Sequence, residues 1–193
     1  MNNNSNIYTL FLLLSVNIFC YSQKIIETDI FTVNYSEELE QPLWLEYNII
    51  CIDGDFSRKG MSFKKNKNIH TSDNLDYKDN IWDKGHLAPA STFDCSKEMI
   101  LKTFTYLNCA LQHTKLNKGP WASLERYERE LAESYDVNVR VDLIFNDESL
   151  ILLTGATVPD YFIKTINYDD KTIKVKFPNS DVAGMSWDSF IIE

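Results

Sequence analysis

An eight-residue segment at positions 83–90 reads Asp-Lys-Gly-His-Leu-Ala-Pro-Ala and combines charged, basic and turn-forming side chains. Its histidine, His86, can act as a general base near neutral pH, because the reference pKa of imidazole is about 6.5. A reaction that depends on this base is expected to slow below about that pH. Gly85 permits an unusual backbone angle beside the imidazole. A Gly-His pair alone is usually structural, so a catalytic role for His86 requires further residues.

Amide and carboxylate side chains form a second group between residues 108 and 125. Asn117 offers an amide oxygen, and Mg²⁺ prefers oxygen ligands in near-octahedral geometry at about 2.1 Å while it keeps several waters. Simpler interpretations remain open at this point. Asn117 can serve as a helix N-cap, and Asn108 and Gln112 can fix a strand end through amide hydrogen bonds.

Taken together, the two groups resemble the DNA/RNA non-specific endonucleases, the ββα-metal nuclease family that includes endonuclease G. The family sequence Asp-Arg-Gly-His-Leu-Ala-Pro-Ala differs from residues 83–90 only at Lys84. The family also carries, farther along the chain, residue types that this sequence places at the same spacing: Asn108, Gln112, Asn117, Trp121 and Leu124-Glu125. The resemblance extends over residues 43–190.

The resemblance implies a role for each matching residue. His86 would be the general base that takes a proton from water, and Asn117 would bind a single Mg²⁺ ion, or Mn²⁺, directly. Glu125 would hold metal-bound water, and Asn108 would orient the site. The implied reaction is the sequence-non-specific endonucleolytic hydrolysis of phosphodiester bonds. Both DNA and RNA are expected substrates, because such a site addresses phosphate rather than base edges.

Two features depart from the family sequence. Lys84 keeps a positive charge for catalysis and phosphate binding but lacks the planar fork with which arginine grips a phosphate at two points. We expect reduced activity, and the alternative is a catalytically weak or inactive nucleic-acid-binding homologue. The family has another arginine upstream, for which Arg58 or Lys59 is the candidate substrate-binding residue.

The charge of the chain is distributed unevenly. The net charge of −9 argues against nucleic acid as a partner, because phosphate binding favours a basic surface. Residues 56–67, however, contain five cations and no anion. This basic run can bind a phosphate backbone on an otherwise acidic protein, although a solvated loop explains it equally well.

The periodicity of the chain predicts one mixed α+β domain over residues 23–193, with an antiparallel-rich central sheet flanked by helices. Strands are expected at residues 43–52, 137–145, 150–154, 161–168 and 171–177, and the last two could pair as a hairpin. Helices are expected after the N-cap Ser96 and over residues 116–133. Residues 56–80 are expected to cross the surface without regular structure. His86 is expected at a strand end, with Asn117 on the facing helix near its start, where the helix dipole adds positive potential.

The first 22 residues differ from the rest. They lack Lys, Arg, Asp and Glu and contain an apolar run at residues 7–19, which is typical of a secretory signal peptide cleaved after Ser22. The mature protein is expected to be secreted or periplasmic and to lie free of the membrane, and a homodimer is one assembly that the sequence allows. Cys51, Cys95 and Cys109 then remain, and the sequence does not decide between one disulfide with a free thiol and three free thiols.

Overall fold

The computed structural model describes residues 23–193, so the expected signal peptide at residues 1–22 lies outside the described residues. Within them the strands and helices are β1 (Gln23–Glu27), β2 (Thr32–Ser36), β3 (Gln41–Asn48), β4 (Trp82–His86), α1 (Lys97–Thr103), β5 (Cys109–His113), α2 (Thr114–Leu116), α3 (Ala122–Ala132), β6 (Val137–Ile144), β7 (Tyr161–Tyr168) and β8 (Lys171–Pro178). None of the helices among residues 23–193 has the length and apolar character needed to cross a membrane.

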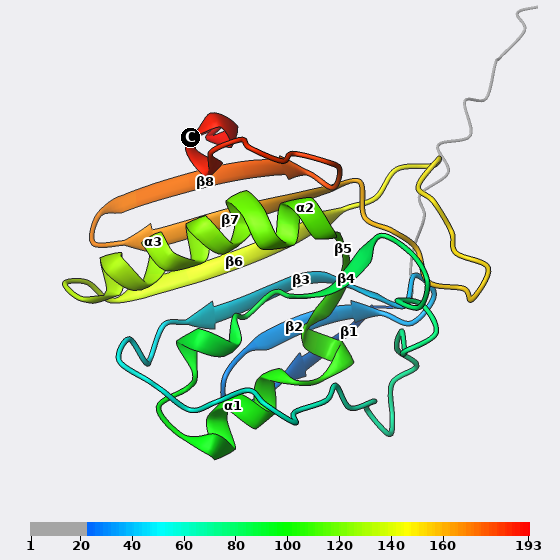
Figure 1. Ribbon diagram of the computed structural model, residues 1–193, viewed down its shortest axis with the longest axis horizontal. Helices are drawn as coiled ribbons and strands as arrows, with labels where there is room; N and C mark the ends of the chain where they lie inside the picture. Colours follow the sequence, from blue (N-terminus) through cyan, green and yellow to red (C-terminus); the bar gives the residue numbers. More distant parts are fainter. Residues whose placement is uncertain (1–22) are drawn as a thin grey trace, which may run out of the picture.

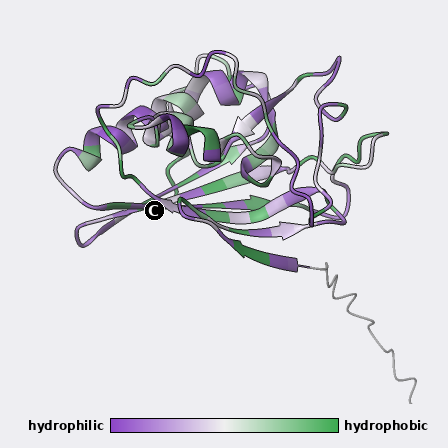
Figure 2. Cartoon of the chain, turned by 90° about the horizontal axis from the view of Figure 1, so that it is seen from below, coloured by the Kyte–Doolittle hydropathy of each residue, from purple (hydrophilic) through white to green (hydrophobic). Residues whose placement is uncertain are grey.

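Six strands form one antiparallel sheet in the order β1-β2-β3-β6-β7-β8, and β4 pairs with β5 in a separate two-stranded sheet (Figure 1). Buried and less buried residues alternate along β6, as an antiparallel strand with one covered face requires. The helices lie on one face of the large sheet, above its strands in Figure 2. The predicted mixed α+β architecture with an antiparallel-rich sheet is therefore confirmed.

Aromatic side chains join the long helix to the sheet. The indole of Trp121 is 1% exposed and packs edge-on against Phe162 of β7, with 5.4 Å between the ring centroids. Phe177 of β8 lies 5.7 Å from the same indole. Large aromatic rings bury more apolar area than other side chains, so these contacts fix where α3 lies on the sheet. They thereby position the residues that the helix presents to the pocket described below.

The two-stranded sheet brings the two sequence motifs together. His86 is the last residue of β4, as predicted, and it is paired with Cys109, the first residue of β5. Gly85 does not adopt a positive φ; its role is to leave space, because a Cβ atom there would lie 2.3 Å from the side-chain oxygen of Gln112. The chain leaves β5 directly into the helical region that carries Asn117, which completes a ββα arrangement.

The predicted helix at residues 116–133 is correct in place but not continuous. Helical structure begins at Thr114, and a π-helical segment, Asn117–Trp121, separates α2 from α3. Pro120 has no N–H to donate and its ring crowds the preceding turn, and Gly119 takes a non-helical conformation beside it. Asn117 therefore lies near the start of the helical region, as expected, but it is not an N-cap, because His113 holds that place for α2. The prediction of Ser96 as an N-cap is confirmed, because its hydroxyl accepts a hydrogen bond from the Met99 amide.

Strand predictions succeeded where alternation was clear. The hairpin of β7 and β8 is present, and its turn places Asp169 at a φ of 50°. The predicted strand at residues 150–154 is wrong: only the isolated bridge between Ile151 and Thr157 occurs there, and Leu153 is fully exposed. Its apolar residues lie in a loop closed by local backbone hydrogen bonds, including Val158 to Leu150. Residues 56–80 lack regular secondary structure apart from a bridge at Lys64, as expected.

One disulfide joins Cys51 to Cys95, and Cys109 is a buried free thiol. This resolves the two alternatives that the sequence left open. The bridge ties the chain after β3 to the turn before α1, on the path that carries Arg58 to the pocket described below. Disulfides persist in oxidising compartments, so this bridge is compatible with export.

Candidate active site

A pocket of about 200 Å³ collects five of the residues that the sequence selected: Arg58, Lys84, His86, Asn117 and Glu125. They come from the loop after β3, from β4, from the π-helical segment and from α3, so only the folded chain brings them together. Pro89, Ala90 and Ser91 complete the wall. Lys59, the other candidate cation, is not part of this lining.

His86 is held between aromatic rings rather than by carboxylates. The ring centroids of Phe63 and Phe104 lie 4.8 and 4.9 Å from the imidazole. Its Nε2 is buried and has no hydrogen-bond partner among residues 23–193. Burial, assisted by the positive charge of Arg58, lowers the pKa of His86 to about 3. The imidazole is therefore neutral across the physiological range, and the expected fall in rate below about pH 6.5 stays a prediction that a pH–rate profile would test.

Asn117 is oriented by the first residue of the 83–90 segment. Its Nδ2 donates to Asp83 Oδ2 across 3.0 Å, and Lys118 Nζ lies 3.0 Å from the same oxygen. Burial opposes ionisation of Asp83, but the hydrogen bonds from Asn117 and Lys118 outweigh it and hold the pKa of this carboxyl below its usual value. Because the amide nitrogen of Asn117 donates to Asp83, its amide oxygen is the atom that is free to bind a cation. No role was predicted for Asp83 from sequence, although it is the first residue of the 83–90 segment.

Glu125 lies on α3 and accepts a hydrogen bond from the indole Nε1 of Trp121 at 2.9 Å. Burial raises the pKa of Glu125 to about 7; nearby Lys164 opposes this shift and Glu128 adds to it. Arg129 donates to the backbone carbonyl of Glu125 and to the hydroxyl of Ser91. The indole of Trp121 thus holds the carboxylate, and Arg129 holds the backbone of the same residue at the wall of the pocket.

A buried ion pair lies beneath Glu125. Lys164 of β7 and Glu128 of α3 are both fully buried, and 2.7 Å separates Nζ from Oε1. The second oxygen of Glu128 accepts a hydrogen bond from the Tyr47 hydroxyl, and Lys164 Nζ lies 4.3 Å from the centroid of the Trp121 ring. The sequence contained a signal for this pair: the alternation of β7 places Lys164 on its buried face.

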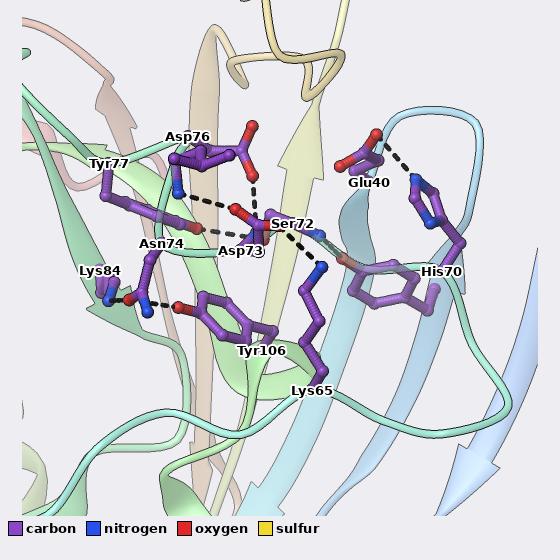
Figure 3. A network of polar contacts seen from close by, with 12 residues as sticks. Glu40, Lys65, His70, Ser72, Asp73, Asn74, Asp76, Tyr77, Lys84 and Tyr106 are labelled. Carbon is purple, nitrogen blue, oxygen red and sulfur yellow. Dashed lines mark hydrogen bonds and ion pairs between the residues drawn. The ribbon is translucent and has the colours of Figure 1, made fainter.

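Lys84 is held by an asparagine and by aromatic rings. Its ammonium donates to Asn74 Oδ1, which also accepts from the Tyr106 hydroxyl at 2.8 Å (Figure 3). The centroids of Phe63, Tyr77 and Tyr106 lie 5.4–5.7 Å from the Lys84 nitrogen, within cation–π range. The charge that replaces the family arginine is therefore anchored at the edge of the pocket.

Asn108 lies outside the pocket and contacts the backbone of Ala88, which follows His86 by two residues. It is fully buried, its Oδ1 accepts from the Ala88 amide at 2.8 Å, and its Nδ2 donates to the carbonyls of Ala88 and Thr103. It is a positioning residue for the turn that follows β4. Gln112, by contrast, has no side-chain hydrogen bond among the described residues, and Asn179 instead ties down the end of β5.

The metal-binding role fits this chemistry. The amide oxygen of Asn117 and the carboxylate of Glu125 are hard oxygen ligands of the kind that Mg²⁺ prefers, and the pocket has room for water. Among residues 23–193, no cluster of three or more His, Cys, Asp or Glu side chains forms an alternative metal centre.

A sequence profile described as "DNA/RNA non-specific endonuclease" matches residues 19–193. The chain belongs to the DNA/RNA non-specific endonuclease family. This match confirms the resemblance drawn from residues 83–125, and it covers the sheet and helices that hold the pocket together.

Two curated relatives of this family are human proteins. The chain is 35% identical to "Endonuclease G, mitochondrial" over 85 residues, which make up 42% of this chain and 29% of the relative. It is 33% identical to "Nuclease EXOG, mitochondrial" over 109 residues, which make up 54% of this chain and 30% of the relative. The matched region thus spans less than one third of each relative.

The fold of the family also appears in a solved structure. The chain superposes with a TM-score of 0.79 and 21% identity on a protein in "Crystal structure of the EndoG/EndoGI complex: Mechanism of EndoG inhibition". The match covers 88% of this chain and 80% of that one. The likeness shows that the two chains share a fold.

Proposed function

We propose that this protein is a metal-dependent, sequence-non-specific endonuclease that hydrolyses phosphodiester bonds in DNA and RNA. The observation that carries the proposal is the convergence of Arg58, Lys84, His86, Asn117 and Glu125 on one pocket. A base, an oxygen donor for a metal and two cations together address the phosphate and the attacking water. Membership of the DNA/RNA non-specific endonuclease family supports this proposal.

Each residue of the chain has a distinct task in this reaction. His86 is neutral at physiological pH and accepts the proton of the attacking water. Arg58 and Lys84 bind phosphate oxygens, and Asn117, held by Asp83, offers its oxygen to the metal. Glu125 fixes water beside that position. When bound, Mg²⁺ or Mn²⁺ stabilises charge on the phosphate and on the departing oxygen.

The residues of the pocket do not distinguish DNA from RNA. Phosphate contacts carry no sequence information, and none of the proposed tasks requires a 2′-hydroxyl. We also propose that the protein is exported, on the basis of the apolar N-terminal segment and the Cys51–Cys95 disulfide. A homodimer remains a prediction that size measurement in solution would test.

A cleavage assay tests the proposed reaction. The purified protein is incubated with supercoiled plasmid and with single-stranded RNA, in Mg²⁺ and in a chelator. Cleavage of both substrates is expected to require the metal and to be lost in His86→Ala. His70→Ala is the matched control, because His70 is exposed and pairs with Glu40 away from the pocket. A plasmid that shifts on a gel but stays intact would instead establish the non-catalytic binding alternative.

A further inference from the structure

A second pocket, of about 280 Å³, lies beside the anchored ammonium of Lys84. Its lining consists of Phe63, Lys65, Asp73, Asn74, Leu75 and Tyr106. Asn74 connects the two pockets, because it lines this one while its Oδ1 accepts from Lys84, which lines the catalytic one. Figure 3 shows Asn74 between Lys84 and the Tyr106 hydroxyl, with Lys65 extending toward Asp73.

The basic run of residues 56–67 is held against the catalytic strands at this place. Lys64 forms a parallel bridge with Thr105, and its amide and carbonyl bond to Phe104 and Tyr106. This pairing sets the ring of Phe63 5.6 Å from that of Tyr106 and 4.8 Å from the imidazole of His86. The pocket wall is thus built on the same elements as the proposed base.

We propose that this second pocket binds one unpaired nucleobase of the substrate strand, next to the phosphodiester bond that is cleaved. The proposal rests on the proposed nuclease function and names the part of the substrate that the site selects. Phe63 and the apolar side chain of Leu75 supply the surface for the base, with Tyr106 as the floor.

The composition of the pocket suits a planar, polar ring. Leu75 is 62% exposed, so its side chain is accessible to a base that enters the pocket. Aromatic side chains bind bases of any sequence, because every base has a π face. Asn74 uses its oxygen for Lys84 and Tyr106, and among the described residues its amide nitrogen has no partner, so it can donate to acceptor atoms that all bases carry.

The charges around this pocket favour the strand that carries the base. Lys65 forms an ion pair with Asp73 at 2.7 Å, yet half of its side chain is exposed. Lys64 and Lys67 are exposed on the same run, so the backbone that leaves the pocket meets cations. This arrangement explains how a chain with net charge −9 can hold a polyanion.

Such a pocket distinguishes single strands from duplexes. In a duplex both faces of each base are covered by its neighbours, so a base must leave the stack before an aromatic wall can contact it. An unpaired strand does not incur that cost. We therefore expect the protein to cleave single-stranded nucleic acid about tenfold faster than duplex, measured as kcat/KM under equal salt.

Oligonucleotides with one cleavable bond test the proposal. A single-stranded pentanucleotide carries one phosphodiester and methylphosphonates elsewhere, with a base or an abasic residue on either side of the phosphodiester. Loss of the base on one side is expected to lower kcat/KM about tenfold, and loss on the other side to change it less than twofold. The ratio of the rates with and without the base is the readout, so a general change in activity cancels.

Two variants locate the effect. Phe63→Leu keeps an apolar side chain but removes the ring, so the base-to-abasic ratio is expected to fall toward one. Leu75→Asp is expected to lower the same ratio. Because Leu75 is exposed, this variant keeps the proposal testable if Phe63→Leu fails to fold. Phe56→Leu is the matched control, because Phe56 is an exposed phenylalanine of the same basic run that lies outside this pocket.

The outcomes separate this proposal from the proposed function. Metal-dependent cleavage with a ratio near one on both sides overturns the base pocket and leaves the nuclease function intact. If no substrate is cleaved, the base pocket is tested by the binding of normal and abasic oligonucleotides to the metal-free protein. Tighter binding of the normal strand that Phe63→Leu abolishes supports the pocket, and equal binding overturns it.

Discussion

Asp83 and Asn117, which lie 34 residues apart, meet through a hydrogen bond of 3.0 Å from the Asn117 amide to the Asp83 carboxylate. The contact links the first residue of the 83–90 segment to the proposed metal ligand. Because Lys118 pairs with the same carboxylate, Asp83 stays ionised, and its pKa lies below the usual value despite partial burial. The Asp83 carboxylate thus orients the amide of Asn117.

Asp83→Ala is expected to weaken metal binding by about 10–100-fold, as the loss of a group that orients a metal ligand typically does. The amide of Asn117 would then rotate freely. Calorimetric titration with Mn²⁺ measures the dissociation constant. Asp79→Ala is the control, because Asp79 is exposed and pairs with Lys78 at 3.9 Å, away from the pocket. Equal Mn²⁺ affinity in wild type and Asp83→Ala would show that Asn117 needs no such support.

His86 is expected to reduce stability at acid pH. Its folded pKa, about 3, lies below the unfolded value of about 6.5, so the unfolded chain binds more protons between these values. Stability from this group is complete above pH 6.5 and is lost as pH falls toward 3, by at most about 1.4 kcal/mol per pH unit. Urea unfolding between pH 3 and 4.5, below the range in which Glu125 contributes its opposing slope, should show this slope in wild type and its loss in His86→Gln. A slope that persists in the variant would assign it to another group.

Glu125 is expected to act in the opposite direction in the metal-free protein. Its folded pKa, about 7, lies above its reference value of 4.5, so its contribution is complete below pH 4.5 and is lost as pH rises through 7. Between pH 4.5 and 6.5 the two slopes oppose each other. Urea unfolding should therefore show stability that falls with rising pH in His86→Gln and rises with pH in Glu125→Gln. Parallel curves for the two variants would contradict both assignments.

The buried pair beneath the pocket predicts an asymmetric response to substitution. Lys164→Met leaves the Glu128 carboxylate buried without its partner and is expected to lower the free energy of unfolding by about 3–5 kcal/mol. Lys164→Met with Glu128→Leu removes both charges and should recover most of that loss. Lys174→Met is the control, because Lys174 pairs with Glu193 at the surface. Equal instability of the single and double variants would argue against an uncompensated charge.

The sequence predicted which residues meet at the candidate site better than it predicted the contacts that hold them there. The segment containing His86 and the spacing to Asn117 and Glu125 were identified through their match to the family sequence, since each motif alone also has a structural interpretation. Asp83 and Asn74 were not, since both act through contacts between residues distant in sequence. A short amide or carboxylate looks the same in sequence whether it binds a metal, a neighbour or water.

The strands of the fold were likewise predicted only in part. Strands β7 and β8 were predicted within one residue because their alternation is regular, and their turn residues are polar. Strands β1 and β2 were missed, because each has only five residues and a mixed pattern. The strand predicted at residues 150–154 was wrong because an apolar, β-branched composition indicates only a propensity for strand, and the structure leaves Leu153 in solvent.

Lys84→Arg tests whether the lysine is a weakened form of the family arginine. The lysine ammonium already donates to Asn74, which leaves fewer protons for a phosphate. A guanidinium has five donors and can bond to Asn74 and grip a phosphate at two points at once. We expect kcat/KM on single-stranded DNA to rise about fivefold in Lys84→Arg, equivalent to about 1 kcal/mol. In Lys84→Met the rate should fall, and the slope of binding affinity against salt should decrease by about one. Slower cleavage by Lys84→Arg would show instead that the aromatic rings and Asn74 are fitted to an ammonium.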